Sequence, residues 1–257
     1  MPSKGRGDRI VNGWLGPLRA ALDARPAPVW FFFRDDDAGW DDTALEALLD
    51  VFEHDGLPLD VAAIPLAGTS RTAEIIIARQ ASGRNDLRVH QHGLAHINHE
   101  PEGRKCEFGV SRSPEQQRDD IEHGRDVLRG SYGDVPAIFT PPWNRCAPWT
   151  AEVLCDLGFA VLSRDLSAGR AAVPGLVELP VTVDWFAKRR KVPLDRTARG
   201  ELLAEMAGGQ GPVGVMLHHS VMTAQDRADV GELLALVKAH PGASAAHLDR
   251  LAQSRAH

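Results

Sequence analysis

The sequence lacks the features that mark several classes of protein. Only three of its 257 residues are cysteine, and Cys106, Cys146 and Cys155 have neither an even count nor the Cys-x-x-Cys spacing of a metal site. We therefore expect reduced, mostly buried thiols. No apolar run approaches the roughly 20 residues of a membrane helix, and no apolar stretch follows the positively charged start of the chain as in a signal peptide. These absences predict a cytoplasmic protein without a membrane span.

Positive charge is also in deficit. Lys and Arg number 29 against 35 Asp and Glu, so the formal net charge is -6 and the pI is near 6.0. A surface that binds phosphate backbones would favour an excess of basic residues, and no basic stripe is apparent. Nucleic acid is therefore excluded as the main partner.

Short apolar runs alternate along the whole chain with segments of helical periodicity, and Gly56 is expected to end the first of these. The six predicted helical segments are 41–56, 69–83, 113–130, 148–158, 195–209 and 224–240. No linker, low-complexity tract or internal repeat divides it, and 43% hydrophobic residues are enough for a full core. The pattern predicts an α/β fold over a single domain, 1–257, as a distorted (β/α) barrel of about seven parallel strands. The seven strand-like runs are 29–33, 57–65, 87–93, 137–143, 159–164, 176–185 and 212–219.

Polar residues with reactive side chains follow five of these runs. Active sites of (β/α) barrels gather at the carboxyl ends of the strands, on the loops that lead into the helices. We therefore expect the five clusters to meet at one end of the barrel. They are Asp35–Asp37, His90–His99, Pro141–Arg145, Asp184 with Trp185, and His218 with His219.

Two of these clusters together favour a metal. His92 and His96 are four residues apart, which puts both imidazoles on one face of a helical turn, although many such spacings bind nothing. Neighbouring carboxylates repel one another unless a cation or a shared proton relieves them. Two histidines and one of the aspartates would leave a coordination position open for water, as in catalytic sites. Helix capping explains Asp41 or Asp42 but leaves the earlier three aspartates unexplained.

The ordered motifs resemble those of the NodB-type polysaccharide deacetylases, carbohydrate esterase family four. That family has an Asp-Asp pair, His-x-x-x-His, a proline-rich loop, an Asp-Trp segment and a terminal Leu-His. Here they stand in the same order over residues 34–219, as "RDDDAG", "HGLAH", "TPPWNR", "VDWF" and "MLHH".

The resemblance implies a role for seven residues. It implies a divalent metal, with zinc the first choice for two imidazoles and one carboxylate. The implied metal ligands are Asp37, His92 and His96. The implied catalytic residues are Asp36 as general base, His218 as general acid, Asp184 as the carboxylate that orients this acid, and Trp143 as a backbone N–H donor to the oxyanion.

The chain also departs from the family pattern. Thr140 stands where the family has an arginine that pairs with the base, so that role is empty or is filled by Arg34 or Arg145. His219 stands where an aspartate is common, and neighbouring residues on a strand point to opposite faces, so only one of the two histidines can be the acid. We expect Asp35 to turn to solvent or to Arg34.

Three tryptophans adjoin the motifs. Trp40, Trp143 and Trp185 could offer aromatic faces to a sugar ring, and ordinary packing is the alternative for each. Cys146 lies beside the proline-rich loop without an evident base, so packing rather than nucleophilic chemistry is expected.

The function expected from these residues is metal-dependent removal of an N-acetyl or similar N-acyl group from an amino sugar or glycan precursor. Two alternatives stay open. One is a metal- or carbohydrate-binding protein of the same fold without turnover. The other is a metal-independent glycoside hydrolase that uses Asp36 and Asp184 as its acid and base.

Overall fold

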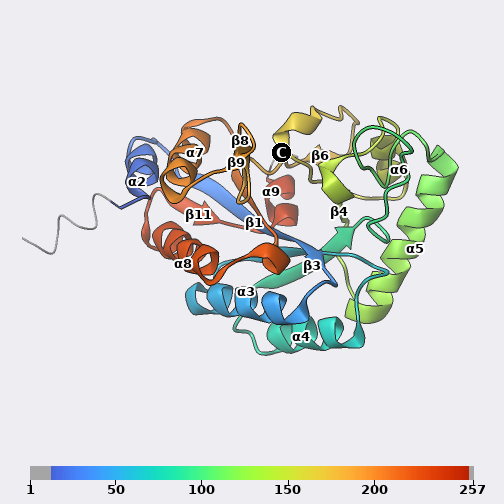
Figure 1. Cartoon of the computed structure of the whole chain (residues 1–257), viewed down its shortest axis with the longest axis horizontal. Helices are drawn as coiled ribbons and strands as arrows, with labels where there is room; N and C mark the ends of the chain where they lie inside the picture. Colours follow the sequence, from blue (N-terminus) through green and yellow to red (C-terminus); the bar gives the residue numbers. More distant parts are fainter. Residues whose placement is uncertain (1–12, 255–257) are drawn as a thin grey trace, which may run out of the picture.

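The computed structural model describes residues 13–254, which form a curled parallel sheet with helices packed around it (Figure 1). The strands follow the order β6-β5-β4-β3-β2-β1-β10-β7, and β11 also pairs with β1. Because β6 and β7 are consecutive in the chain yet stand at the two edges, the sheet curves into an incomplete barrel. The predicted α/β distorted barrel is thereby confirmed. Its strands are β1 (Val29–Ala38), β2 (Leu59–Ala63), β3 (Leu87–His92), β4 (Ile138–Thr140), β5 (Val161–Leu162), β6 (Val177–Glu178), β7 (Val183–Asp184), β10 (Val213–Leu217) and β11 (Ala243–Ala245).

Strand β1 runs through the centre of the sheet and is buried on both faces. Phe31 and Phe33 pack into the core beneath the helices, whereas Phe32 points into the barrel. This explains the unbroken apolar run, which is typical of a central parallel strand. The strand does not end at Phe33, however. It continues through Asp35 to Ala38, and every one of these residues is buried.

The helices cover the outer face of the sheet, and the six whose periodicity predicted them are all present. Helix α3 begins after Asp41, whose side chain accepts a hydrogen bond from the N–H of Ala44, and it ends at Gly56 with φ of 64°. None of the helices between residues 13 and 254 is both long and apolar enough to cross a bilayer. The helices are α2 (Gly16–Asp23), α3 (Asp42–Asp55), α4 (Ser70–Ala81), α5 (Pro114–Tyr132), α6 (Thr150–Asp156), α7 (Arg196–Gly208), α8 (Ala224–Ala239) and α9 (Leu248–Gln253).

Some elements were not predicted from the sequence. Helix α9 closes the interior at the amino ends of the strands, where Leu248 and Leu251 pack with Phe32. Strand β11 adds to β1 just before this helix. A hairpin of β8 (Lys188–Arg189) and β9 (Val192–Pro193) interrupts the connection from β7 to α7.

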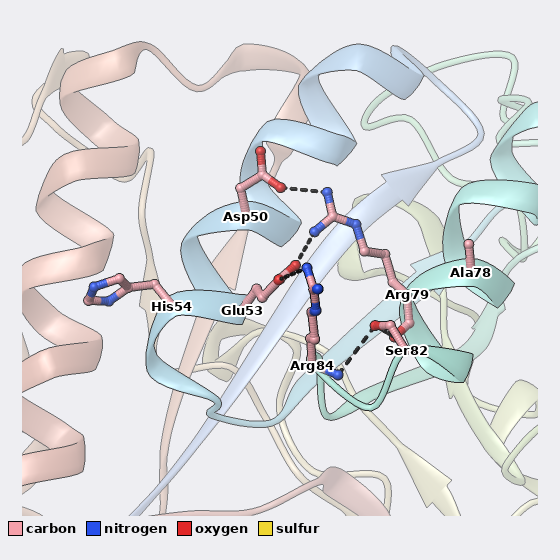
Figure 2. A pocket seen from close by; sticks show the side chains of 7 residues that line it. All are labelled: Asp50, Glu53, His54, Ala78, Arg79, Ser82 and Arg84. Atoms are coloured by element: carbon pink, nitrogen blue, oxygen red, sulfur yellow. Dashed lines mark hydrogen bonds and ion pairs between the residues drawn. The ribbon is translucent and has the colours of Figure 1, made fainter.

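A surface hollow of about 550 Å³ lies between α3 and α4 (Figure 2). Arg79 pairs there with Asp50 and Glu53, and Arg84 also pairs with Glu53. These residues stand at or beyond the carboxyl ends of both helices, and therefore near the amino ends of the strands. The network fastens α3 to α4 at the end of the barrel opposite to the polar motifs, and all its charges are balanced.

Candidate active site

A pocket of about 370 Å³ opens at the carboxyl ends of β1, β3, β4 and β10. It collects six of the seven residues to which the resemblance assigns a role, and leaves out Asp184. It also contains three that were not assigned one. The lining residues are Asp36, Asp37, Trp40, His92, His96, Lys105, Trp143, Asn144 and His218.

Three side chains in this pocket form the one group, among residues 13–254, with the spacing of a metal site. The ligand atoms of Asp37, His92 and His96 lie within 4.8 Å of one another. Asp37 Oδ1 is 3.1 Å from His92 Nε2 and 3.2 Å from His96 Nε2. His92 Nδ1 lies 3.0 Å from the carbonyl oxygen of Thr140, which can only accept, so Nδ1 carries a proton and the Nε2 lone pair is free for a cation.

The electrostatics of the cluster agree with a cation site. Burial alone would raise the pKa of Asp37, but hydrogen bonds from His92 and His96, with the charges of His92 and His218, hold it well below its ordinary value. Burial likewise opposes charge on His92, yet its pKa is raised by Asp37 and Asp36. The buried carboxylate thus requires a positive charge beside it, which a cation bound by all three side chains would supply, and this donor set of two nitrogens and one oxygen fits zinc.

The loop that carries His96 is held by a buried carboxylate. Glu107 is 2% exposed and accepts the backbone N–H groups of Leu94, Ala95 and Ile97 at 3.2, 2.8 and 3.3 Å. Gly93 opens this loop at φ of 59°, and a Cβ there would meet a Glu107 oxygen at 2.1 Å. Glu107 was missed at the sequence level because a single acid in a loop carries no local signal of its role.

Backbone strain is concentrated around the pocket. Seven non-glycine residues between 13 and 254 have positive φ, and four of them line it, namely Asp37, His96, Trp143 and Asn144. Such conformations are costly for residues with a Cβ and cluster at functional sites, where the surrounding structure imposes them. Trp143 has φ of 55° and ψ of 18°, which are not helical angles, and its backbone N–H has no hydrogen-bond partner among the described residues.

Arg34 occupies the role left vacant by Thr140. Its Nε and Nη2 donate to both oxygens of Asp36 at 2.7 and 2.9 Å, and the guanidinium also donates to Ser163 and Asn144. Burial would raise the pKa of Asp36, but Arg34, followed by His92 and His218, lowers it below its ordinary value. Asp36 is therefore a carboxylate, free to accept a proton. The other candidate, Arg145, instead donates to the carbonyl oxygen of Lys105.

The two histidines of "MLHH" face in opposite directions. His218 lines the pocket, is 26% exposed at its side chain, and places Nε2 3.9 Å from Asp37 Oδ2. His219 is fully buried, and its Nδ1 lies 2.7 Å from Asp35 Oδ2. The alternation of neighbouring strand residues thus leaves His218 as the histidine on the pocket side.

The expectation that Asp35 turns to solvent or to Arg34 is wrong. Asp35 is 0% exposed and accepts both the backbone N–H and the ring Nδ1–H of His219. Burial opposes charge on His219, but Asp35 and the carbonyl of Trp40 outweigh it and raise its pKa to about 9. His219 Nε2 is 2.6 Å from that carbonyl oxygen, so the imidazolium ties the end of β10 to the loop that carries Trp40.

Asp184 does not touch His218. It lies within electrostatic range, but its Oδ1 accepts the backbone N–H of Phe186, and no ion pair within 4.0 Å joins it to the histidine. Burial, as the largest influence, raises the pKa of Asp184. The Phe186 ring meets the His218 ring instead, with centroids 6.3 Å apart.

Two of the three tryptophans form walls of the pocket. The rings of Trp40 and Trp143 have centroids 4.7 and 4.3 Å from that of His96. Trp185 is a core residue at 1% exposure and packs edge-on against Trp14. Cys146 lies outside the pocket, beside Arg164, and burial raises the pKa of its thiol, which is the packing role expected.

Comparisons with known protein structures identify the fold. No protein-family model and no curated protein matches the sequence. A protein from Mycobacterium smegmatis assigned as a polysaccharide deacetylase matches in structure with a TM-score of 0.68 and 18% identity, over 91% of this chain and 93% of that one. A family 4 acetyl xylan esterase from Clostridium thermocellum, in complex with a cobalt ion, matches with a TM-score of 0.58 and 18% identity, over 88% and 92%.

A third structural match is a family 4 pseudoenzyme from Bacillus anthracis, with a TM-score of 0.58 and 13% identity, over 89% of this chain and 66% of that one. The fold is therefore that of the NodB-type family 4 carbohydrate esterases, as the motifs predicted. Since enzymes and a pseudoenzyme share it, the fold leaves activity to be argued from the site.

The site predicts that metal binding depends on the supporting loop as well as on the ligands. We expect His96→Ala to lose most of the zinc, because two protein ligands remain. Glu107→Gln should weaken zinc binding by about tenfold, since its amide nitrogen cannot accept the N–H groups that fix the His96 loop. Elemental analysis and competition with a chromophoric chelator measure both.

His99→Ala is the matched control, because it removes a neighbouring histidine that is outside the cluster. Zinc affinity of wild-type strength in His96→Ala would show that the ligand set is wrong. The same result in Glu107→Gln alone would limit Glu107 to packing.

The buried His219–Asp35 pair predicts a loss of stability at high pH. The folded pKa of about 9 lies above the ordinary value of 6.5, so the contribution is complete below pH 6.5 and disappears as pH rises to about 9. We expect the free energy of unfolding of the wild type to fall by about 3 kcal/mol more than that of His219→Gln over this interval.

Urea unfolding at pH 6 and pH 9.5 measures the difference. His54→Gln, which changes an exposed histidine on α3, should behave as the wild type does. An identical pH dependence in the wild type and His219→Gln would mean that the pair is not charged in the folded protein.

Proposed function

We propose that this chain is a metal-dependent hydrolase that removes an N-acetyl or similar N-acyl group from an amino sugar or glycan precursor. One observation carries the proposal: the Asp37, His92 and His96 cluster shares a pocket with a carboxylate, Asp36, and an imidazole, His218. A cation site flanked by a proton acceptor and a proton donor is the set that amide hydrolysis by water requires. The two aromatic walls fit a sugar ring.

The site residues divide the chemistry among them. A divalent cation held by Asp37, His92 and His96 would polarise the acyl oxygen and acidify water, and zinc is the proposed ion. Asp36 accepts the proton of the attacking water, and its pairing with Arg34 fixes the direction of its oxygens. The unpartnered N–H of Trp143 donates to the oxygen that becomes negative as the carbonyl turns tetrahedral.

The leaving amine needs a proton before the bond to the acyl carbon breaks. His218 is the pocket residue able to supply it, since it is partly exposed and its ring turns toward Asp37. Phe186 packs against this ring and limits its rotation, which is the part that Asp184 was expected to play. Asp184 contributes only its nearby charge.

A binding protein without turnover is the second candidate, because a pseudoenzyme is among the structures with this fold. The glycoside hydrolase has less support. Asp184, the second carboxylate that it needs, is not among the residues that line the pocket. Metal chelation distinguishes the glycosidase from the proposed deacetylase. A metal-independent glycosidase would stay active and would release reducing sugar rather than acetate.

The proposal predicts the effect of one substitution. Asp36→Asn should keep zinc and substrate binding, because the three ligands are intact and the amide is nearly isosteric. It should also lower the stability of the fold, since Arg34 loses its buried counter-charge. Turnover should fall by roughly 10²- to 10⁴-fold, the usual contribution of a positioned acid or base. Acetate release from a panel of N-acetylated sugars, sugar nucleotides and oligosaccharides, with zinc content on the same samples, provides the measurement.

Asp50→Asn is the matched control, because it neutralises a carboxylate in the network of Figure 2, at the other end of the barrel. Acetate release by Asp36→Asn at the wild-type rate would remove Asp36 from the mechanism. If the zinc-loaded wild type released no acetate or formate from any sugar of the panel, the binding protein would be the better reading.

A further inference from the structure

Lys105 contributes a positive charge to the pocket that the chemistry described above does not use. It lies in the connection between β3 and α5, lines the pocket, and is exposed. Its Nζ is 5.9 Å from the centroid of Trp143, whose ring is in turn 4.3 Å from that of His96. The ammonium therefore stands one aromatic side chain away from the metal ligands, where the remainder of a bound sugar would extend.

This cation is reinforced rather than neutralised by its neighbours. Arg145 donates to the carbonyl oxygen of Lys105 at 3.0 Å, and burial together with the charge of Arg104 lowers the pKa of Arg145. Between residues 13 and 254, no carboxylate lies within 4.0 Å of a charged nitrogen of Arg104, Lys105 or Arg145. Asp165 lies within electrostatic range of Arg145 but makes no ion pair with it within 4.0 Å. In a chain of net charge -6, three adjoining cations without a carboxylate in direct contact indicate a place for an external anion.

A second group of cations lies on the β8–β9 hairpin, which follows the carboxyl end of β7. The β8–β9 hairpin contains the run "KRRK", Lys188 to Lys191. A short basic segment is therefore present, although no basic stripe was expected. All four residues are exposed, and none forms an ion pair with another described residue. The hairpin follows β7, so it belongs to the carboxyl end of the barrel, and Phe186, two residues before it, packs on His218.

The tip of this hairpin has charged residues at turn positions where Asn and Gly are favoured. Arg190 and Lys191 both have positive φ, at 51° and 69°. Two-residue turns with both central residues in this region normally take Asn and Gly, because a Cβ is disfavoured there. Two long cations are instead held at the tip in a strained conformation, which is a feature of functional segments.

We propose that these two groups form a cationic rim, Arg104, Lys105 and Arg145 with the 188–191 hairpin, and that it binds a substrate carrying a phosphate or carboxylate group. This deepens the proposed function by naming the substrate as an anionic amino sugar. Lys105 meets the anion beside Trp143, and the hairpin attracts it from the opposite flank of the pocket, since β2, β1 and β10 separate β3 from β7.

Equilibrium binding to the zinc-loaded protein tests this without reliance on turnover, so its failure is distinct from failure of the proposed hydrolysis. The probes are N-acetylglucosamine, its 1-phosphate, and N-acetylmuramic acid, which are neutral, phosphorylated and carboxylated. We expect one or both anionic sugars to bind more tightly than the neutral one, and this preference to decrease from low salt to 0.5 M salt as screening grows. The two anionic probes distinguish phosphate from carboxylate.

Variants assign the effect to the rim. Lys105→Gln should weaken binding of the preferred anionic sugar by roughly two- to fivefold and leave N-acetylglucosamine unchanged, as expected for one solvent-exposed ionic contact. Changing all four hairpin cations to Gln should reduce the salt dependence. Arg84→Gln is the control, because it also removes one positive charge, from the network of Figure 2.

Equal binding of neutral and anionic sugars, or an unchanged anion preference in Lys105→Gln, would overturn the proposal. A hairpin variant that binds the sugars as the wild type does, but no longer binds phosphatidylglycerol vesicles, would also overturn the hairpin's part in it. That outcome would assign the hairpin to a lipid surface. Circular dichroism on each variant excludes loss of fold as the cause.

Discussion

The buried pair of Arg34 and Asp36 is the interaction on which the rest of the site depends. Both side chains are almost completely excluded from water, inside a barrel that also holds buried apolar residues such as Phe32. Moving two charges out of water costs more than their attraction returns unless every donor is satisfied. Arg34 meets this condition through Asp36, Ser163 and Asn144. Such a pair is poor evidence for stability and better evidence for a carboxylate that must stay ionised.

The same constraint explains how three consecutive aspartates can be tolerated in a buried strand. Each has a different partner: His219 for Asp35, Arg34 for Asp36, and His92 with His96 for Asp37. Strand alternation sends Asp35 and Asp36 to opposite faces of β1. At Asp37 the backbone φ is positive, and the pairing of β1 with β2 shifts register between Asp35 and Ala38. The partners of Asp35 and Asp37 come from other strands and loops, and Arg34 needs Ser163 and Asn144 for its remaining donors. The barrel must therefore close around this stretch for the charges to be compensated.

Much of the fold could be predicted because its signals are local. Apolar runs and helical periodicity located six of the helices, and Asp41 and Gly56 marked the limits of α3. Strand β11 and helix α9 were not predicted, since a three-residue strand and a short helix have no periodicity to detect.

Within the site, the spacing of His92 and His96 was visible in the sequence. The pairing of Asp35 with His219 was not, because 184 residues separate them and only the parallel pairing of β1 with β10 brings them together. Glu107 was not predicted because a single acid in a loop carries no local signal of the N–H groups that it accepts.

The central claim is that Asp37, His92 and His96 hold a catalytic cation beside the Arg34–Asp36 pair. Anomalous diffraction at the zinc edge, from crystals of the wild-type protein grown with zinc, tests it most directly. The account predicts one strong peak about 2.0 to 2.2 Å from Asp37 Oδ1, His92 Nε2 and His96 Nε2, the usual lengths of zinc bonds to these atoms, with Asp36 outside the coordination sphere. A peak coordinated by Asp36, or no peak while both imidazoles remain bonded directly to Asp37, would contradict it.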